Sequence, residues 1–188
     1  MHATQVLYTT LVALWAGSEI WLGLRKHAGT GARDGGTLRL LLVTIYASIF
    51  LAVWLSHAHL LPFPAPLHAP LFHAGLGLMA GGLVFRWWAI HVLGRYFTVN
   101  VAIADDHRIV RAGPYRWLRH PSYTGALATF LGFGLCQGDM LSLLVVGMPV
   151  TCVFLWRIRV EEQVLATAFP VDYPAYARQT RRLLPGIW

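Results

Sequence analysis

Residues 113–125 read GPYRWLRHPSYTG and form a polar, aromatic segment between long apolar runs. Pro121 suits the first turn of a helix, where its missing N–H costs no hydrogen bond, and this makes His120 the expected N-cap. The amides of Ser122 and Tyr123 are then expected to be free for a ligand, since a helix N-terminus binds anions. With an aromatic side chain and arginines nearby, the segment favours a planar, partly anionic small molecule. Contact with lipid phosphates is the plainer alternative.

The composition is typical of a membrane protein with several spans. Hydrophobic residues make up 56% of the 188 residues, charged residues only 12%, and the mean hydropathy is +0.54, values that a soluble domain of this size rarely reaches. The chain has 15 Lys and Arg against 8 Asp and Glu, but these cations form short clusters between apolar runs. We therefore expect membrane lipids, and no nucleic acid, as partners, and the oligomeric state stays open.

Five apolar runs approach the roughly 20 residues that a spanning helix needs. Gly77 and Gly81 form a small-xxx-small pattern in the third run, which predicts close packing with a neighbouring helix. The predicted fold class is all-α, a polytopic membrane protein with about five transmembrane helices. Residues 1–94 would hold three N-terminal spans, and residues 95–188 a polar loop, a helical hairpin and a C-terminal helix and tail. The five runs are Val6–Leu24, Leu38–Leu60, Leu71–Leu93, His120–Gln137 and Met140–Trp156.

Basic residues occur in alternate linkers, and the turns between these linkers carry no Lys or Arg. This parity predicts an N-terminus outside and a C-terminus in the cytosol. Arg86 is the one cation left inside a span. Two interpretations stay open for it: snorkelling to the cytoplasmic interface, or a charge that faces a polar cavity and binds substrate. The clustered cations are Arg25, Lys26, Arg33 and Arg39, then Arg95, Arg108, Arg111, Arg116 and Arg119, then Arg157, Arg159, Arg178, Arg181 and Arg182.

Arg157 and Glu161 are four residues apart, so they share one face of a helix that runs on from the last span into the cytosol. An ordinary intrahelical ion pair is one interpretation, since such pairs are frequent on exposed helices. The other is a division of duties, with Arg157 holding an anionic acceptor and Glu161 a cationic or hydroxyl-bearing donor. The spacing leaves both open. Beyond them, Pro170 and Pro174 are expected to stop a regular helix, and residues 173–188 to fold over the inner face.

No metal site or soluble nucleotide-binding fold is predicted. His57, His59, His68 and His73 bracket a proline-rich turn, but no carboxylate or thiol joins them, and interfacial histidines are often unliganded. The chain has no GxGxxG or phosphate-loop pattern and no arrangement of Ser, His and Asp that argues for nucleophilic catalysis. The chemistry is therefore expected at the polar segment and the helix that carries Arg157.

Two ordered motifs follow one another in the second half of the chain. The first is Gly113-Pro114-Tyr115-x-x-x-Arg119-His120-Pro121-Ser122-Tyr123-x-Gly125, and the second, after a hydrophobic hairpin, is Arg157-x-x-x-Glu161-Glu162-x-x-Leu165 followed by Tyr173-x-x-Tyr176. Together they resemble the isoprenylcysteine carboxyl methyltransferase family. The resemblance extends from Arg95 to Pro185 and needs both motifs at the proper separation, so it is much more specific than either motif alone.

The resemblance implies an integral membrane enzyme that takes a methyl group from S-adenosylmethionine on the cytosolic side and gives it to a lipophilic acceptor. It implies that Arg157 and Glu161 are catalytic and that Arg157 contacts the acceptor. Two positions depart from the family: Asn100 stands where eukaryotic members tend to have Gln, and Pro170 replaces the Gly that usually follows Phe. Carried over position by position, the cofactor-binding set is Asn100, His107, Arg108, Ile109, Val110, Tyr115, His120, Pro121, Ser122, Tyr123 and Glu161.

A carboxylate acceptor, such as that of a prenylcysteine or a similar small molecule, is favoured. It is already nucleophilic, so transfer needs positioning and shielding from water but no general base. The same signature suggests relatives that methylate thiols or phospholipid amines, which would need deprotonation by Glu161, Glu162 or a histidine. The compact chain favours a small lipophilic acceptor over a prenylated protein, and a bacterial inner membrane over the endoplasmic reticulum.

A membrane reductase is the alternative from another enzyme class. Sterol-reductase-like proteins resemble this family in their C-terminal helices and bind a nicotinamide cofactor there. The 2′-phosphate of NADPH would prefer several convergent arginines, and a non-catalytic lipid-binding role is a third hypothesis. The arginines that could meet such a phosphate are Arg108, Arg111, Arg116 and Arg119.

Overall fold

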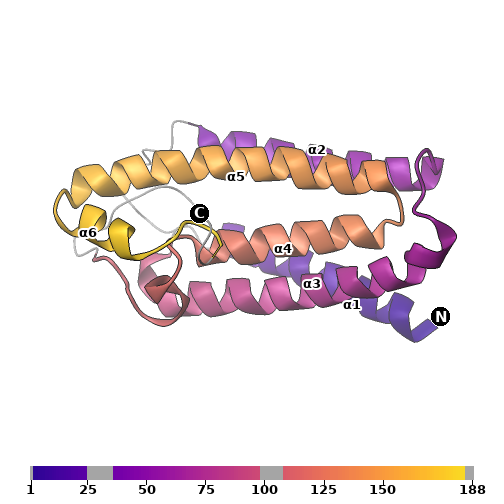
Figure 1. Ribbon diagram of the computed structural model, residues 1–188, viewed down its shortest axis with the longest axis horizontal. Coiled ribbons are helices and arrows are strands. Elements are labelled where there is room, and N and C mark those ends of the chain that lie inside the picture. Colours follow the sequence, from indigo (N-terminus) through magenta and orange to yellow (C-terminus); the bar gives the residue numbers. More distant parts are fainter. Residues whose placement is uncertain (1, 25–35, 98–107, 185–188) are drawn as a thin grey trace.

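The protein is described by a computed structural model that covers residues 2–24, 36–97 and 108–184, and within these ranges it is all-helical (Figure 1). The predicted all-α class is confirmed. Two 3-10 turns, η1 (Gly94–Tyr96) and η2 (Gly113–Arg116), lie between the third and fourth helices. The helices are α1 (His2–Leu24), α2 (Thr37–Ala58), α3 (Ala65–Leu93), α4 (Pro121–Cys136), α5 (Met140–Ala168) and α6 (Asp172–Gln179).

Four of the described helices, α1, α2, α3 and α5, are long and apolar enough to cross a membrane. The fourth predicted run forms α4, which has only 16 residues. At 1.5 Å per residue α4 measures about 24 Å, less than the roughly 30 Å hydrocarbon core of a bilayer. Four candidate membrane-spanning helices therefore stand, and the fifth crossing stays a prediction.

The start of α3 differs from its predicted position, whereas the continuation of α5 beyond Trp156 agrees with the prediction. α3 begins six residues before the predicted start, because Pro66 lies in its first turn, where a missing N–H needs no intrahelical partner. The proline-rich turn between α2 and α3 is therefore short, because α3 already begins at Ala65. α5 continues past Trp156 to Ala168, as predicted, and its N-cap Asp139 accepts a hydrogen bond from the amide of Ser142 at 3.1 Å.

α3 and α4 pack with their backbones in close contact at four glycines. A Cβ atom added to Gly82 would come within 2.6 Å of the carbonyl oxygen of Gly125. Seven residues away along each helix, a Cβ on Gly132 would come within 2.6 Å of the carbonyl oxygen of Gly75. Real Cβ atoms do not approach backbone so closely, so larger side chains at these positions would push the two helices apart. The start of α4 is thereby fixed against α3.

The glycines that make this contact are not those that the sequence pattern predicted. A Cβ atom added to Gly77 or Gly81 would meet nothing within 4 Å in the described part of the chain. The prediction that this pair packs against a helix is therefore wrong. Glycines do allow close packing of α3, as predicted, but they lie on another face of the helix. A spacing of four residues identifies a row of small residues without showing which row meets a neighbouring helix.

α1 packs across α3 and α4 through aromatic side chains. The rings of Trp15 and Phe130 meet edge to face with centroids 4.8 Å apart, and the ring of Phe133 lies 5.7 Å from the same indole. Such ring pairs add about 0.5–1.5 kcal/mol beyond the burial of their surface. α2 lies along α5 (Figure 1), where the hydroxyl of Ser142 donates to the carbonyl of Ala52 at 2.8 Å.

The two ends of the bundle carry different groups (Figure 1). At the end where α1 begins, the α2–α3 turn meets the α4–α5 turn: the amide of Leu61 donates to the carboxylate of Asp139 at 2.9 Å, and the amide of Met140 donates to the Leu61 carbonyl at 2.9 Å. At the opposite end lie η2, the start of α4, the end of α5 and α6. The polar segment and the helix that carries Arg157 are thus at the same end, as the predicted hairpin requires.

Candidate active site

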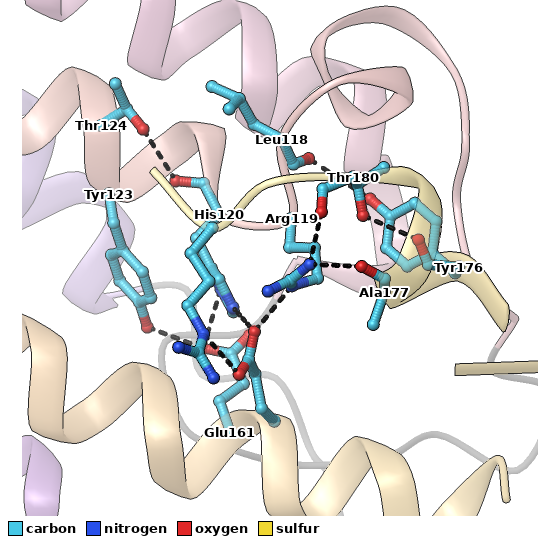
Figure 2. Close-up of polar contacts among 11 residues, drawn as sticks. Leu118, Arg119, His120, Tyr123, Thr124, Glu161, Tyr176, Ala177 and Thr180 are labelled. Carbon is cyan, nitrogen blue, oxygen red and sulfur yellow. Dashed lines mark hydrogen bonds and ion pairs between the residues drawn. The ribbon is translucent and has the colours of Figure 1, made fainter. Parts of the chain in front are cut away.

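The start of α4 follows the prediction made from its proline. His120 is the N-cap residue and Pro121 is the first residue of the helix. The amide of Tyr123, however, donates to the His120 carbonyl at 3.0 Å. The prediction that this amide is free for a ligand is therefore wrong, because the first turn closes on its own cap. The same turn directs the side chains of His120 and Tyr123 toward Glu161 on α5 (Figure 2).

The hydroxyl of Tyr123 joins Arg157 to Glu161. Arg157 donates from Nε to this hydroxyl at 3.0 Å, and the hydroxyl donates to Oε2 of Glu161 at 3.0 Å. A tyrosine hydroxyl can accept one hydrogen bond while it donates another, so the two contacts are compatible. The residues spaced i, i+4 on α5 are therefore linked through a side chain of another helix, which their spacing alone does not reveal.

Arg157 and Glu161 differ in their exposure to solvent. Arg157 is only 2% exposed, whereas 31% of the Glu161 side chain is exposed. A buried guanidinium attracts an anion strongly because little water screens it, and a half-exposed carboxylate remains accessible to a cation or to hydroxyl donors. The ring of Phe154 packs against that of Tyr123 with centroids 5.1 Å apart and excludes water on one side. The site thus presents opposite charges on either side of one phenol.

His120 lies between two neighbouring carboxylates of α5. Its Nε2 is 3.4 Å from Oε1 of Glu162, and its Nδ1 is 3.9 Å from Oε2 of Glu161. The imidazole also stacks on the ring of Tyr123, with centroids 5.7 Å apart and the planes inclined by 20°. Because His120 is buried, its imidazole restrains the ring of Tyr123, while Arg157 and Glu161 restrain the hydroxyl.

Glu162 has a structural role that reasoning from the sequence missed. Besides the imidazole, its carboxylate contacts Nε of Arg119 at 2.7 Å and Nε of Arg182 at 2.9 Å. Arg119 also donates from Nη1 to the carbonyls of Ala177 at 2.8 Å and Thr180 at 2.6 Å (Figure 2). A second carboxylate directly after the motif's glutamate, in a chain with only 8 acidic residues, is the signal that could have found it.

A C-terminal strap, residues 180–184, lies against the polar segment. The amide of Arg119 donates to the Arg181 carbonyl at 2.7 Å, and the hydroxyl of Thr124 donates to the Leu183 carbonyl at 2.7 Å. These bonds hold the described part of the tail over the site end of the bundle, and that this end is the inner face stays a prediction. α5 ends at Ala168, two residues before Pro170, as predicted. Pro174, however, lies in the first turn of the short helix α6, so the prediction that it stops a helix is wrong. The tail is therefore part of the site's framework.

Tyr115 lies in η2 and is buried beneath α6. The hydroxyl of Tyr176 donates to the Tyr115 carbonyl at 2.7 Å, which fixes η2 against α6. Burial raises the pKa of the Tyr115 phenol well above its ordinary value, and the nearby charge of Glu161 raises it further. Tyr115 therefore stays neutral, as an aromatic ring with a hydroxyl should be if it is to stack or to form hydrogen bonds with a ligand.

The structure relates the remaining predicted residues to the site less directly. Arg108 is exposed, and Ile109 and Val110 are half-buried in the irregular segment that leads into η2. Asn100 and His107 lie outside the described residues. Across the described ranges, no group of three His, Cys, Asp or Glu side chains is arranged to hold a metal ion. The predicted residues that the structure brings to one end of the bundle are Tyr115, His120, Pro121, Ser122, Tyr123, Arg157 and Glu161.

Known proteins match this chain along most of its length. A family model for the isoprenylcysteine carboxyl methyltransferase family matches residues 75–167. A probable protein-S-isoprenylcysteine O-methyltransferase of Oryza sativa subsp. indica is 30% identical over 96% of this chain and 95% of its own. Protein-S-isoprenylcysteine O-methyltransferase A of Arabidopsis thaliana is 31% identical over 90% of this chain and 87% of its own. The protein-S-isoprenylcysteine O-methyltransferase of Saccharomyces cerevisiae is 34% identical over 60% of this chain and 48% of its own.

The matched region contains α4, most of α5 and every contact between them that builds the site. The motifs that suggested the resemblance therefore coincide with the residues that the fold brings together. With 30% and 31% of the aligned residues identical over 95% and 87% of the length of two relatives, the chain belongs to the isoprenylcysteine carboxyl methyltransferase family.

Proposed function

We propose that the protein is a membrane-embedded methyltransferase that moves a methyl group from S-adenosylmethionine to a lipophilic carboxylate, such as that of a prenylcysteine or a similar small molecule. One observation carries the proposal: the Tyr123 hydroxyl links the buried guanidinium of Arg157 to the half-exposed carboxylate of Glu161. An anion-binding and a cation-binding group are thereby held side by side. The relatives are named as O-methyltransferases of protein S-isoprenylcysteine, which supports the same activity here.

The chemistry of the side chains at this end of the bundle fits the cofactor. When bound, S-adenosylmethionine supplies an electrophilic methyl group on a sulfonium cation. The Glu161 carboxylate attracts a cation, and the aromatic ring of Tyr115 would suit a cation or an adenine. With the family motif, the residues that would hold the cofactor are Asn100, His107, Arg108, Ile109, Val110, Tyr115, His120, Pro121, Ser122, Tyr123 and Glu161.

Arg157 would hold the acceptor carboxylate. Its Nε is fixed by the Tyr123 hydroxyl at 3.0 Å, so the plane of the guanidinium, and with it the anion that it binds, has a set orientation. A carboxylate needs no deprotonation before it attacks, so the residues contribute orientation and exclusion of water, and no general base is assigned. Glu161, which accepts from the same hydroxyl, would lie on the cofactor side of the phenol.

The alternatives are less well supported. A thiol or phospholipid amine would need a base, and the carboxylate of Glu162 is already engaged by Arg119 and Arg182. For a reductase that uses NADPH, the arginines of the polar segment would have to converge on a phosphate. Arg119 instead turns inward to Glu162, and Arg116 stacks on the neighbouring Trp117, its guanidinium carbon 3.7 Å from the ring centroid.

The topology that we propose has five crossings, with α4 as the fifth, the N-terminus outside and the site facing the cytosol, in a bacterial inner membrane. It is supported by the distribution of charge, because the end of the bundle that holds the site carries Arg111, Arg116, Arg119 and Arg182, whereas the α2–α3 and α4–α5 turns at the opposite end carry no Lys or Arg. A short helix such as α4 is tolerated where the bilayer thins locally or polar flanks reach the interface.

Methyl-labelled S-adenosylmethionine provides the decisive test. The purified protein would be incubated in lipid nanodiscs with a panel of prenylcysteines, fatty acids, thiols and phospholipids, beside an Arg157→Ala control. We expect label in a carboxyl methyl ester of a prenylcysteine or a similar lipophilic acid, released by mild base. Label that resists base, in a thioether or an amine, would overturn the carboxylate assignment. Absence of label from every acceptor would overturn the function.

A further inference from the structure

Glu19 of α1 and Arg86 of α3 form an ion pair beside the active site. Arg86 donates from Nε to Oε1 of Glu19 at 2.8 Å and from Nη2 to Oε2 at 3.0 Å, so the pair has two parallel bonds. Arg86 is the buried member, with 11% of its side chain exposed against 39% for Glu19. Charges within membrane helices are costly and mark functional sites by default. The sequence left the role of Arg86 open and did not single out Glu19, the one acidic residue in α1.

The same guanidinium also holds the first turn of α4. Its Nη1 donates to the carbonyl of Ser122 at 3.2 Å, one residue before Tyr123. The backbones of the two helices touch at this level, because a Cβ on Gly125 would come within 2.6 Å of the amide nitrogen of Arg86. A guanidinium can bind a carboxylate with one edge and a carbonyl with another, which a point charge such as an ammonium does not do. Arg86 therefore connects α1 to the residue next to Tyr123.

We infer that Glu19 and Arg86 are positioning residues for methyl transfer. Glu19 orients the guanidinium of Arg86, and Arg86 holds the Ser122 carbonyl, so that the Tyr123 hydroxyl stays between its two partners on α5. This inference rests on the proposed function. It gives Arg86 a role that acts through the backbone of α4 and not through contact with the acceptor.

Contacts other than the ion pair between Glu19 and Arg86 also hold α1 against the rest of the bundle. The rings of Trp21 and Trp87 also join α1 to α3, with centroids 5.4 Å apart. At the far end of α1, Nε2 of Gln137 donates to the hydroxyl of Tyr8 at 2.9 Å. That second polar contact supplies a matched control, because Tyr8→Phe removes a hydrogen bond between α1 and Gln137, the C-cap residue of α4, without touching the first turn of α4.

The variants that separate positioning from simple pairing are Arg86→Lys and the charge swap Glu19→Arg/Arg86→Glu. In the swap the charges can pair again, but a carboxylate at position 86 has no donor for the Ser122 carbonyl. We expect the swap to recover most of the thermal stability lost in Arg86→Glu alone, while kcat stays at least about tenfold below that of the unmodified protein, the kind of loss that a small misplacement causes. We expect Arg86→Lys to lower kcat with the acceptor KM within about threefold, and Tyr8→Phe to leave both unchanged.

Hydrogen–deuterium exchange of the peptide that contains residues 118–126 provides a measurement independent of activity. Faster exchange there is expected in Arg86→Lys and in the swap, and no change in Tyr8→Phe. Recovery of kcat together with stability in the swap would overturn the inference, as would a rise confined to the acceptor KM, which would indicate direct contact with the acceptor. Unchanged exchange in both Arg86 variants would overturn it as well. A failure of the proposed function is distinct, because the unmodified protein would then transfer no methyl group while the exchange comparison still holds.

Discussion

The Nε of Arg157 lies 3.0 Å from the hydroxyl of Tyr123, so that a buried guanidinium of α5 is held by the first turn of α4. The same hydroxyl donates to Glu161 at 3.0 Å. Two segments separated by the whole α4–α5 hairpin thus meet at a single oxygen atom. If this oxygen sets the relative position of acceptor and cofactor, its removal should impair transfer far more than it impairs folding.

Tyr123→Phe tests this directly. The ring that stacks on His120 would remain, and only the hydroxyl would be lost. We expect kcat to fall by about 10- to 100-fold, since hydrogen bonds to charged groups are each worth about 1.5–3 kcal/mol. Tyr46→Phe on α2, where the residue is 65% exposed, is the matched control and should leave kcat unchanged. Steady-state kinetics on a lipophilic acid acceptor would check both. Equal kcat values for the two variants would contradict the assigned role.

Arg157 and Glu161 of α5 are predicted to serve different ligands. Arg157→Ala should abolish transfer while the affinity for S-adenosylhomocysteine stays within about threefold, because the proposed ligand of the guanidinium is the acceptor and not the cofactor. Glu161→Ala and Tyr115→Ala should weaken that affinity instead. Calorimetry on protein in nanodiscs measures the affinity, and the exposed Arg159 supplies an Arg→Ala control on the same helix. A similar loss of affinity in all three site variants would argue against this division of labour.

The sequence predicts this site better than it predicts the packing that supports it. Pro121 marks a helix start by its own backbone chemistry, so the N-cap at His120 could be read from local rules alone. The link through Tyr123 depends on how α4 and α5 are rotated about their axes. That rotation is set by tertiary contacts, among them those of Arg86 and Glu162. Rules for local sequence, such as capping preferences, do not predict contacts between residues far apart in the chain.

The close packing of α3 against α4 is predicted to depend on one glycine stripe only. Gly82→Val would drive new atoms toward the Gly125 carbonyl, which lies 2.6 Å from the position of the first added carbon. We expect the melting temperature to fall steeply, since overpacking of this kind costs about 1–3 kcal/mol or more. Gly81→Val, on the adjacent face with nothing within 4 Å among the described residues, should be tolerated. Thermal denaturation followed by tryptophan fluorescence would compare them, and equal stability of the two variants would disprove the packing assignment.

The strap is predicted to depend more on Arg119 than on Arg182, although both bind Glu162. Arg119 has 11% of its side chain exposed and also bonds two carbonyls near the strap, whereas 31% of the Arg182 side chain is exposed. Breaking a buried pair costs about 3–5 kcal/mol, and an exposed pair contributes about 0–1 kcal/mol. Arg119→Met should therefore lower the melting temperature clearly more than Arg182→Met does. A larger drop in melting temperature for Arg182→Met would show that the exposed pair of Arg182 with Glu162 stabilises the strap more than the buried pair of Arg119 with Glu162.

The stability of the site end is predicted to fall in alkali because three of its tyrosines are buried. Burial raises the pKa of Tyr115, Tyr173 and Tyr176 above the ordinary value of 10.0. In the unfolded chain these phenols lose their protons near pH 10, while in the folded protein they keep them, so the rise in pH stabilises the unfolded state relative to the folded state. Their contribution to stability is thus complete below about pH 10 and is lost as the pH rises through the folded pKa values.

Melting temperatures measured from about pH 9 to pH 11, together with the ultraviolet absorbance of phenolate, check this pH dependence. We expect these three phenols to ionise only as the protein unfolds. Tyr173→Phe removes one group that ionises on unfolding, so the melting temperature of this variant should fall less steeply with pH than that of the unmodified protein. Ionisation of all tyrosines before unfolding would mean that water reaches η2 and α6. In that case the packing of Tyr176 against Tyr115 would be contradicted as well.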